Sequence, residues 1–192
     1  MDKQSVISQE DFRQQFAERK PHYEKLATNL QDALKSLLTD KKIAYLEVLA
    51  RVKDVESAYE KIARKEYSKP FEQIEDWCGL RIICYYPSDI DLICKMLKDE
   101  FDVKTQEDTS KRLAAHEFGY RSTHFILQIK PAWASTPNYR TLEGFKAEIQ
   151  VRTILMHAWA EIEHKLSYKS AEQVPEQFKR KLFNPSCGVV GT

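Results

Sequence analysis

Alternating apolar and polar residues between positions 145 and 153, FKAEIQVRT, predict a β-strand with two different faces. The apolar face carries Phe145, Ala147, Ile149 and Val151. The polar face carries Lys146, Glu148, Gln150 and Arg152. Such a polar face is either a solvated strand surface or a surface that holds a metal and phosphates. The strand by itself leaves both interpretations open.

The same reading along the rest of the chain predicts alternating helices and strands. Helices are predicted over residues 9–39, interrupted near Pro21; 54–67, with Asp54 as N-cap; 88–101, capped by Ser88; and 154–168. Strands are predicted over residues 43–52, 79–86, 122–130 and 145–153. Residues 102–118 are expected to be irregular, and residues 131–144 to form a long connection. This order predicts a mixed α/β domain around one sheet.

The predicted helix 154–168 has two contrasting stripes. Its apolar stripe carries Leu155, Trp159, Ile162 and Leu166 and is expected to close the core. The opposite stripe carries His157, Glu161, His164 and Tyr168.

Composition limits the class of protein. The 192 residues are 42% hydrophobic and 31% charged, as expected for one globular domain. Neither a membrane-length apolar run nor a secretion signal is recognisable, which favours a cytoplasmic location. The four cysteines show no CxxC spacing, so free thiols are expected rather than a zinc knuckle or disulfide framework. The net charge of +1 argues against nonspecific nucleic-acid binding by overall positive potential.

Candidate phosphate ligands are side chains, because the chain contains neither a GxxxxGK nor a GxGxxG motif. A basic window holds Arg51, Lys53, Lys61, Arg64 and Lys65. On the predicted helix 54–67, Ser57, Lys61, Arg64 and Lys65 share a face. The alternative is a solvated basic helix face.

Asp76 and Glu148 are a candidate carboxylate pair. Asp76 precedes the predicted buried strand, and Arg81 lies within it, where an unpaired charge would be costly. Two carboxylates at neighbouring strands suit one Mg²⁺, which prefers oxygen ligands. The alternative is a salt bridge between Asp76 and an arginine. In FGYRSTH, Tyr120 is a candidate for base stacking and Arg121 for a phosphate contact.

In order and spacing, the motifs RVKDVESAYEKIARK, DWCGLR, FGYRSTH and AEIQVRTILMHAWAEIEHKLSYK resemble the synthetase domain of the RelA/SpoT family, which includes small alarmone synthetases. The resemblance covers roughly residues 43–169. It implies a nucleotidyltransferase-like fold with a mixed sheet flanked by helices. It also implies Mg²⁺-dependent transfer of the β,γ-pyrophosphate of ATP to a ribose 3′-hydroxyl. With GDP or GTP as acceptor, the product is ppGpp or pppGpp.

The resemblance also implies roles for individual residues. Arg51 and Arg81 match clamps on adenine, and Lys53, Ser57, Lys61 and Arg64 match contacts to the ATP phosphates. Asp76 and Glu148 match the Mg²⁺ carboxylates, and Tyr120 matches the tyrosine that stacks on the acceptor base. Acceptor-side or catalytic positions are matched by Arg121, Gln150, His157, Glu163 and His164. Glu163 is the candidate general base, although it points about 100° away from His164 around the helix.

The chain departs from the family pattern in several places. It has no His-Asp dipeptide, so the hydrolase activity of longer members is not expected. The segment EDTSKRLAAHEFGYRSTH differs from the usual approach to the acceptor tyrosine. Toxin relatives that use the 3′ end of tRNA, or that make adenosine alarmones, are therefore alternatives. Candidate tRNA contacts, which are equally well read as ordinary surface charge, are Lys104, Lys111, Arg112, Lys179, Arg180 and Lys181.

A further alternative is an inactive nucleotide-binding module that pairs with an antitoxin. Small members of the family that the chain resembles often form oligomers, so the resemblance implies a homo-oligomer. The predicted organisation is an N-terminal helical segment, residues 1–42, a synthetase domain, residues 43–183, and an irregular tail, residues 184–192. The tail loses the amphipathic pattern and is interpreted as a truncated or altered end.

Overall fold

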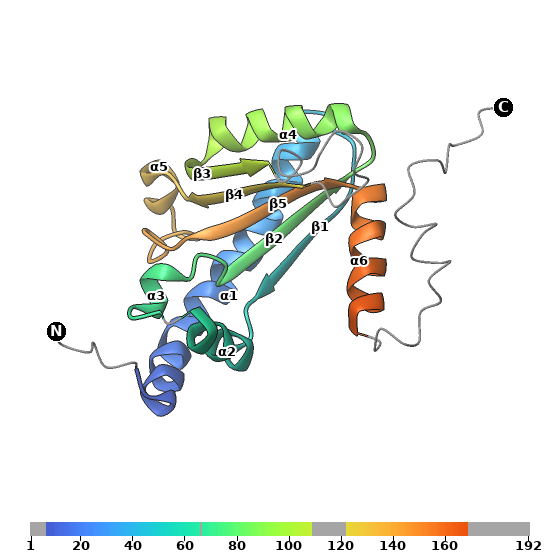
Figure 1. The fold of residues 1–192 in the computed structure, drawn as a ribbon. Coiled ribbons are helices and arrows are strands. Elements are labelled where there is room, and N and C mark those ends of the chain that lie inside the picture. The colour runs from blue at the N-terminus through green and yellow to red at the C-terminus, as the bar shows by residue number, and fades with distance from the viewer. Residues whose placement is uncertain (1–6, 66, 109–121, 169–192) are drawn as a thin grey trace.

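The computed structural model describes residues 7–65, 67–108 and 122–168 (Figure 1). The strands are β1 (Tyr45–Val52), β2 (Cys78–Cys84), β3 (Asp102–Asp108), β4 (Thr123–Gln128) and β5 (Ala147–Thr153). The helices are α1 (Gln9–Asp40), α2 (Val55–Lys65), α3 (Pro70–Gln73), α4 (Pro87–Glu100), α5 (Pro131–Ala134) and α6 (Ile154–Tyr168). The predicted mixed α/β architecture is confirmed.

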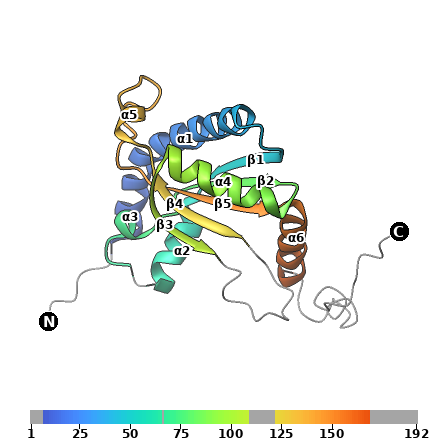
Figure 2. The ribbon, with the colours of Figure 1, turned by 90° about the horizontal axis from the view of Figure 1, so that it is seen from above.

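The strands form one five-stranded sheet in the order β1-β2-β5-β4-β3. Strands β2 and β5 are parallel, and the other neighbouring pairs are antiparallel. The sheet is therefore mixed. Helices α1 and α4 lie on one side of it, and α6 lies on the other (Figure 2).

The hydrophobic core lies between the sheet and the pair α1 and α4. The apolar face of β5 points into it, since Ala147, Ile149 and Val151 are at most 1% exposed. Glu148 and Gln150, which alternate with them, are only partly buried and face the side of α6. The two faces predicted for this strand are confirmed. Burying one face of a strand fixes where its polar neighbours point.

Helix α1 continues through Pro21, so the predicted interruption there is wrong. Pro21 is exposed, and water can reach the backbone carbonyl that its missing N–H leaves unpaired. On either side of it, Phe16 and Tyr23 are buried in the same core. Packing of one continuous apolar stripe outweighs the local cost of the proline.

Three further predictions on local structure are corrected. Residues 102–108, expected to be irregular, form edge strand β3, whose polar sequence lacks the usual strand pattern. The connection after β4 contains the short helix α5. Helix α4 begins at Pro87, and the Asp89 carboxylate accepts from the Tyr86 backbone N–H at 3.3 Å, so Ser88 is not the cap. In contrast, Asp54 does cap α2, accepting from the N–H groups of Glu56 and Ser57 at 3.0 and 3.1 Å.

The orientation predicted for α6 is also wrong. Leu155 is 77% exposed and Ile162 is 44% exposed, so this apolar stripe does not close the core. His157, Glu161 and His164 of the polar stripe face the sheet instead, because the sheet surface beneath α6 presents polar rather than apolar side chains. The core is already filled from the opposite side by α1 and α4.

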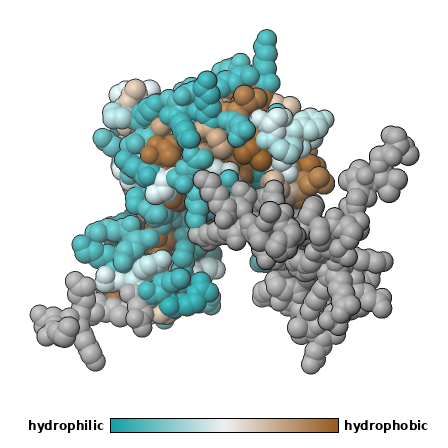
Figure 3. Space-filling model, turned by 45° about the horizontal axis from the view of Figure 1, so that its top comes forward, coloured by the Kyte–Doolittle hydropathy of each residue, from teal (hydrophilic) through white to brown (hydrophobic). Residues whose placement is uncertain are grey.

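On the face shown in Figure 3, the described residues are mainly hydrophilic, with smaller hydrophobic patches. Within the described ranges, no helix is both long and apolar enough to cross a membrane. Cys78, Cys84 and Cys94 are buried free thiols, as expected. Cys187 lies outside the described residues.

Candidate active site

A cavity of about 780 Å³ lies between the polar face of the sheet and α6. Strands β1, β2 and β5 form its floor, and α6 forms one wall. Its charged and polar lining includes Arg51, Arg81, Glu148, Gln150, Arg152 and His164. Roles were predicted from the sequence for five of these residues, and the sixth, Arg152, was predicted only to lie on the polar face of its strand.

Strand register brings the polar residues together. Gly79 of β2 is paired with both Arg51 of β1 and Glu148 of β5. Two positions further along β2, Arg81 pairs with Gln150. Residues paired across strands point to the same face, so these four side-chain positions form one surface. Gly79 has no side chain, and the Nε atom of Arg51 would lie 3.6 Å from a Cβ placed there.

Asp76 lies just before β2 begins, and its carboxylate accepts hydrogen bonds from two lysines. Lys53 Nζ lies 2.7 Å from Oδ2, and Lys61 Nζ lies 3.1 Å from Oδ1. A backbone bond of 2.9 Å from Lys53 N–H to the Trp77 carbonyl holds the end of β1 against this loop. Burial raises the pKa of Asp76, but the hydrogen bonds and charges of both lysines outweigh burial and lower it. The ion pair considered for Asp76 exists, with lysines in place of an arginine.

Glu148 is held by two neighbours on the polar face. His124 Nδ1 lies 3.0 Å from Oε1, and Gln150 Nε2 donates to Oε2 at 3.2 Å. Burial raises the pKa of Glu148, and the hydrogen bond and charge of His124 outweigh burial, so that the pKa lies below its usual value. His124 Nε2 in turn contacts the Ser122 hydroxyl. Ser122, His124 and Glu148 therefore form a hydrogen-bonded chain.

His124 is a candidate site residue that sequence reasoning missed. A usable signal was present, since alternation in STHFILQ places His124 and Ile126 on the face opposite Phe125. The register then pairs His124 with Gln150. Only the pairing of β4 with β5 reveals that this histidine meets Glu148.

Arg81 joins the sheet to α6. Its NH1 group donates to Glu161 Oε1 at 3.1 Å and contacts His157 Nδ1 at 3.4 Å. Its Nε is buried and has no hydrogen-bond partner in the described part of the chain. Burial, followed by the Arg81 charge, lowers the pKa of His157 and favours the neutral imidazole. His157 therefore lies at the base of α6, against Arg81, and His164 lies further along the cavity wall.

The basic face predicted for α2 divides in two. Lys61 turns toward Asp76, whereas Ser57 and Arg64 are exposed to solvent. Tyr120 and Arg121 lie outside the described residues. Glu163 lies in α6, but its side chain is outside the described part as well.

The donor set fits a divalent cation. Asp76 and Glu148 both supply carboxylate oxygens, and the negative charge of Asp76 raises the pKa of Glu148, which indicates that the two carboxylates act on each other. A bound cation would relieve this repulsion. No group of three or more candidate metal ligands occurs among the residues described. A metal here would therefore take its other ligands from substrate phosphates and water.

The fold and this polar surface define a mixed α/β protein with a basic and carboxylate-bearing cavity suited to phosphorylated ligands. The sequence model described as the region found in RelA / SpoT proteins matches residues 50–173. The chain therefore belongs to the RelA/SpoT family.

Individual relatives support this assignment. The chain is 40% identical over 144 residues to the GTP pyrophosphokinase YjbM of Bacillus subtilis (strain 168), covering 70% of this chain and 62% of that protein. It thus spans about three fifths of the length of this curated relative. The small alarmone synthetase 1 from Bacillus subtilis bound to its product pppGpp has 31% identity and a TM-score of 0.69, with 88% of each chain covered. Its structure bound to AMPCPP gives 29% identity and a TM-score of 0.65, with 88% of this chain and 86% of that chain covered.

Proposed function

We propose that this protein transfers the β,γ-pyrophosphate of ATP to the ribose 3′-hydroxyl of GDP or GTP, with Mg²⁺, and so makes ppGpp or pppGpp. The observation that carries the proposal is that Glu148 and Arg81 line one cavity, and that Asp76, bonded to Lys53 and Lys61, lies near enough for its charge to raise the pKa of Glu148. The names of the relatives, a GTP pyrophosphokinase and a small alarmone synthetase bound to pppGpp, support the same reaction.

The basic side chains bind and orient ATP in this proposal. Lys53 and Lys61 exchange the Asp76 carboxylate for the triphosphate oxygens, which are stronger and more numerous acceptors. Arg51 and Arg81 line the same cavity and present planar guanidinium groups to the adenine. When Lys53 and Lys61 turn to phosphate, Asp76 becomes available for the cation.

Glu148 and Asp76 would hold Mg²⁺, and the cation would neutralise charge that develops on the transferred phosphates. The chain of Ser122, His124 and Glu148 orients the Glu148 carboxylate on the floor of the cavity. Gln150 fixes its second oxygen from the neighbouring position on β5. Positioning and charge neutralisation account for most of the catalysis in phosphoryl transfer. A carboxylate held in one orientation would therefore favour the transfer.

On the acceptor side, His157 and His164 are proposed to contact the guanosine nucleotide, and Tyr120 and Arg121 to bind its base and phosphates. Glu163 is proposed to accept the proton of the 3′-hydroxyl. Tyr120 and Arg121, together with the Glu163 side chain, lie outside the described part, so these roles rest on the sequence resemblance alone.

The acceptor is tested by supplying ATP labelled in its terminal phosphate with Mg²⁺ and GDP, GTP, ADP or deacylated tRNA, first separately and then in competition. The proposal expects label in a guanosine tetra- or pentaphosphate. Label at the tRNA 3′ end would replace it with a translation-blocking toxin, and label in an adenosine product with an adenosine alarmone synthetase. ATP binding without transfer to any acceptor would indicate an inactive nucleotide-binding module.

A further inference from the structure

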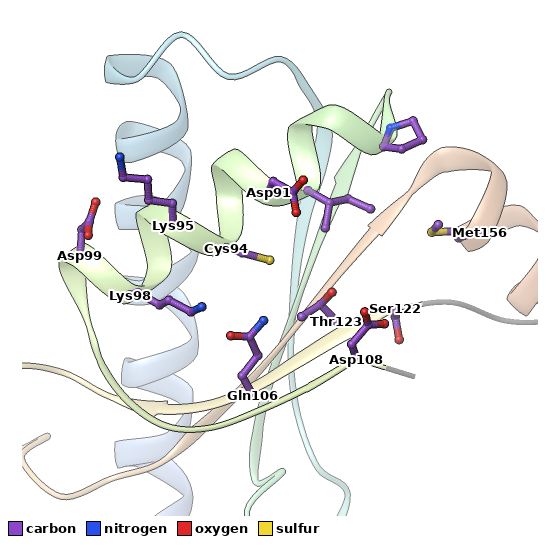
Figure 4. Close-up of a pocket in the computed structure, with 12 residues that line it drawn as sticks. Asp91, Cys94, Lys95, Lys98, Asp99, Gln106, Asp108, Ser122, Thr123 and Met156 are labelled. Carbon is purple, nitrogen blue, oxygen red and sulfur yellow. The ribbon is translucent and has the colours of Figure 1, made fainter. Parts of the chain in front are cut away.

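The charged side chains on the two faces of the sheet differ in burial. On the side of α4, a groove of about 510 Å³ between α4 and strands β3 and β4 is lined by Asp91, Lys95, Lys98 and Asp99 (Figure 4). These four residues are exposed and carry charges of both signs. On the active-site face, Arg152 of β5 is only 3% exposed, and it is the one charged residue of the described ranges that is fully buried. Burying a charge costs free energy, so Arg152 is a candidate for a role in the site.

Arg152 lies near the end of β5, where the chain passes directly into α6. It lines the candidate active-site cavity. Its charge also reaches the first turn of α6, since burial lowers the pKa of His157 most, and the charges of Arg81 and Arg152 lower it further. The guanidinium therefore lies beside the cavity floor and near the base of α6.

A contact of Arg152 continues along the same face of β5. Its NH2 group donates a hydrogen bond to Oε1 of Gln150, whose Nε2 donates to Oε2 of Glu148 at 3.2 Å. The three residues occupy alternate positions of the strand and so share one face. They form a hydrogen-bonded row that runs from a cation through an amide to a carboxylate.

The chemistry of its two ends fixes the direction of this row. A guanidinium can only donate hydrogen bonds, and an ionised carboxylate can only accept them. The amide between them therefore satisfies both neighbours in one orientation, with its oxygen toward Arg152 and its N–H toward Glu148. Without the guanidinium, the amide oxygen loses this partner, and the amide loses the group that fixes its orientation.

We propose that Arg152 is a positioning residue for the active site: its guanidinium fixes the Gln150 amide, and the amide holds the Glu148 carboxylate in the orientation that binds the cation. This inference rests on the proposed function, in which Glu148 is a metal ligand. Arg152 acts through Gln150 on one oxygen of Glu148, and His124 holds the other oxygen. Each carboxylate oxygen keeps a second lone pair for the cation.

The contact is tested first in protein without metal and nucleotide. We would label the glutamine side chains with ¹⁵N and assign the Gln150 amide signal through Gln150→Leu. Arg152→Met keeps a long side chain but removes every donor, and it should move this signal toward the position of solvent-exposed glutamines. Arg152→Lys keeps a charged donor and should retain most of the wild-type shift. Arg140→Met, the same substitution at an exposed arginine, should leave the signal unchanged.

Pyrophosphate transfer then tests the consequence for the reaction. Arg152→Met should lower kcat about tenfold, as expected for loss of a residue that supports a metal ligand, and should change KM for ATP less than about twofold. In a Gln150→Leu background, Arg152→Met should lower kcat by less than about twofold, because the path to Glu148 is already broken. A residue that only stabilised the fold would lower the melting temperature without moving the Gln150 signal.

Three results would overturn the proposal. The first is a Gln150 amide signal that Arg152→Met does not move. The second is an effect of Arg152→Met confined to KM, which would make Arg152 a substrate contact, and the third is an equal loss of kcat with and without Gln150→Leu. Absence of pyrophosphate transfer by the wild-type protein would instead remove the proposed function, and the amide signal would still decide whether Arg152 orients Gln150.

Discussion

Lys53 Nζ lies 2.7 Å from Oδ2 of Asp76, so a residue expected to bind ATP phosphate is bonded to a residue expected to bind metal. Lys61 binds the other oxygen of the same carboxylate. The ammonium groups thus occupy oxygen atoms that a cation needs. Binding of the triphosphate and of the metal should therefore help each other, because phosphate draws the lysines away from Asp76.

This relationship predicts an unusual effect of Lys53→Met. Removing the competing ammonium should tighten metal binding in the absence of nucleotide, by about tenfold for a charge removed at this distance. The same change should slow pyrophosphate transfer, because a phosphate ligand is lost. Mn²⁺ titration followed by electron paramagnetic resonance measures the first effect. Unchanged or weaker Mn²⁺ binding would show that Lys53 does not compete for the carboxylate.

The lowered pKa of Asp76 predicts how stability depends on pH. Burial opposes ionisation, but Lys53 and Lys61 hold the pKa below its unfolded value. Such a carboxylate stabilises the fold fully above its unfolded pKa, and this contribution is lost as the pH falls through the folded pKa. The difference in free energy of unfolding between the wild type and Asp76→Asn should therefore be largest near neutral pH and shrink toward about pH 3. Urea unfolding across this range tests it, and a difference independent of pH would contradict it.

His124→Ala should raise the pKa of Glu148. The variant removes the hydrogen bond and charge that now outweigh burial. Carbon-13 NMR of the glutamate carboxyl groups in metal-free protein measures the change. His22→Ala, on α1, is the control and should leave the pKa of Glu148 where it is. If both variants behave alike, the contact between His124 and Glu148 does not control ionisation.

Glu148→Gln should lower pyrophosphate transfer by at least about a hundredfold, because an amide cannot supply the charge of a metal carboxylate. The change preserves size, so the melting temperature should move by less than about 3 °C. The matched control is Glu60→Gln, at an exposed position of α2. Near-normal activity of Glu148→Gln would remove Glu148 from the metal site.

The position of the core predicts a contrast between two apolar residues. Phe12 is completely buried, stacks on Phe71 and packs at a tilt against Trp77, so Phe12→Ala should cost about 3–5 kcal/mol of unfolding free energy. Leu155 is 77% exposed, so Leu155→Ala should cost less than about 1 kcal/mol. Denaturant unfolding of both variants measures this contrast. Equal costs would place the apolar stripe of α6 in a packed environment.

The family and most of the elements follow from the sequence by itself. Apolar alternation in β5 determined which face is buried, and hence that Glu148 and Gln150 share the polar face, because side chains in a strand alternate strictly. Asp54 was recognisable as a cap because capping depends on residues adjacent in the chain. These signals are local, and local signals can be read without knowing the fold.

Tertiary structure decided the rest. Neither stripe of α6 reveals which one meets the sheet until the core is known to be filled by α1 and α4. Edge strand β3 has no apolar alternation of its own and forms because β4 pairs with it. The contacts of Asp76 with Lys53, and of Glu148 with His124, join residues more than twenty positions apart. Such contacts depend on strand order and register, which a single sequence does not encode locally, so only the folded chain shows which charges neutralise each other.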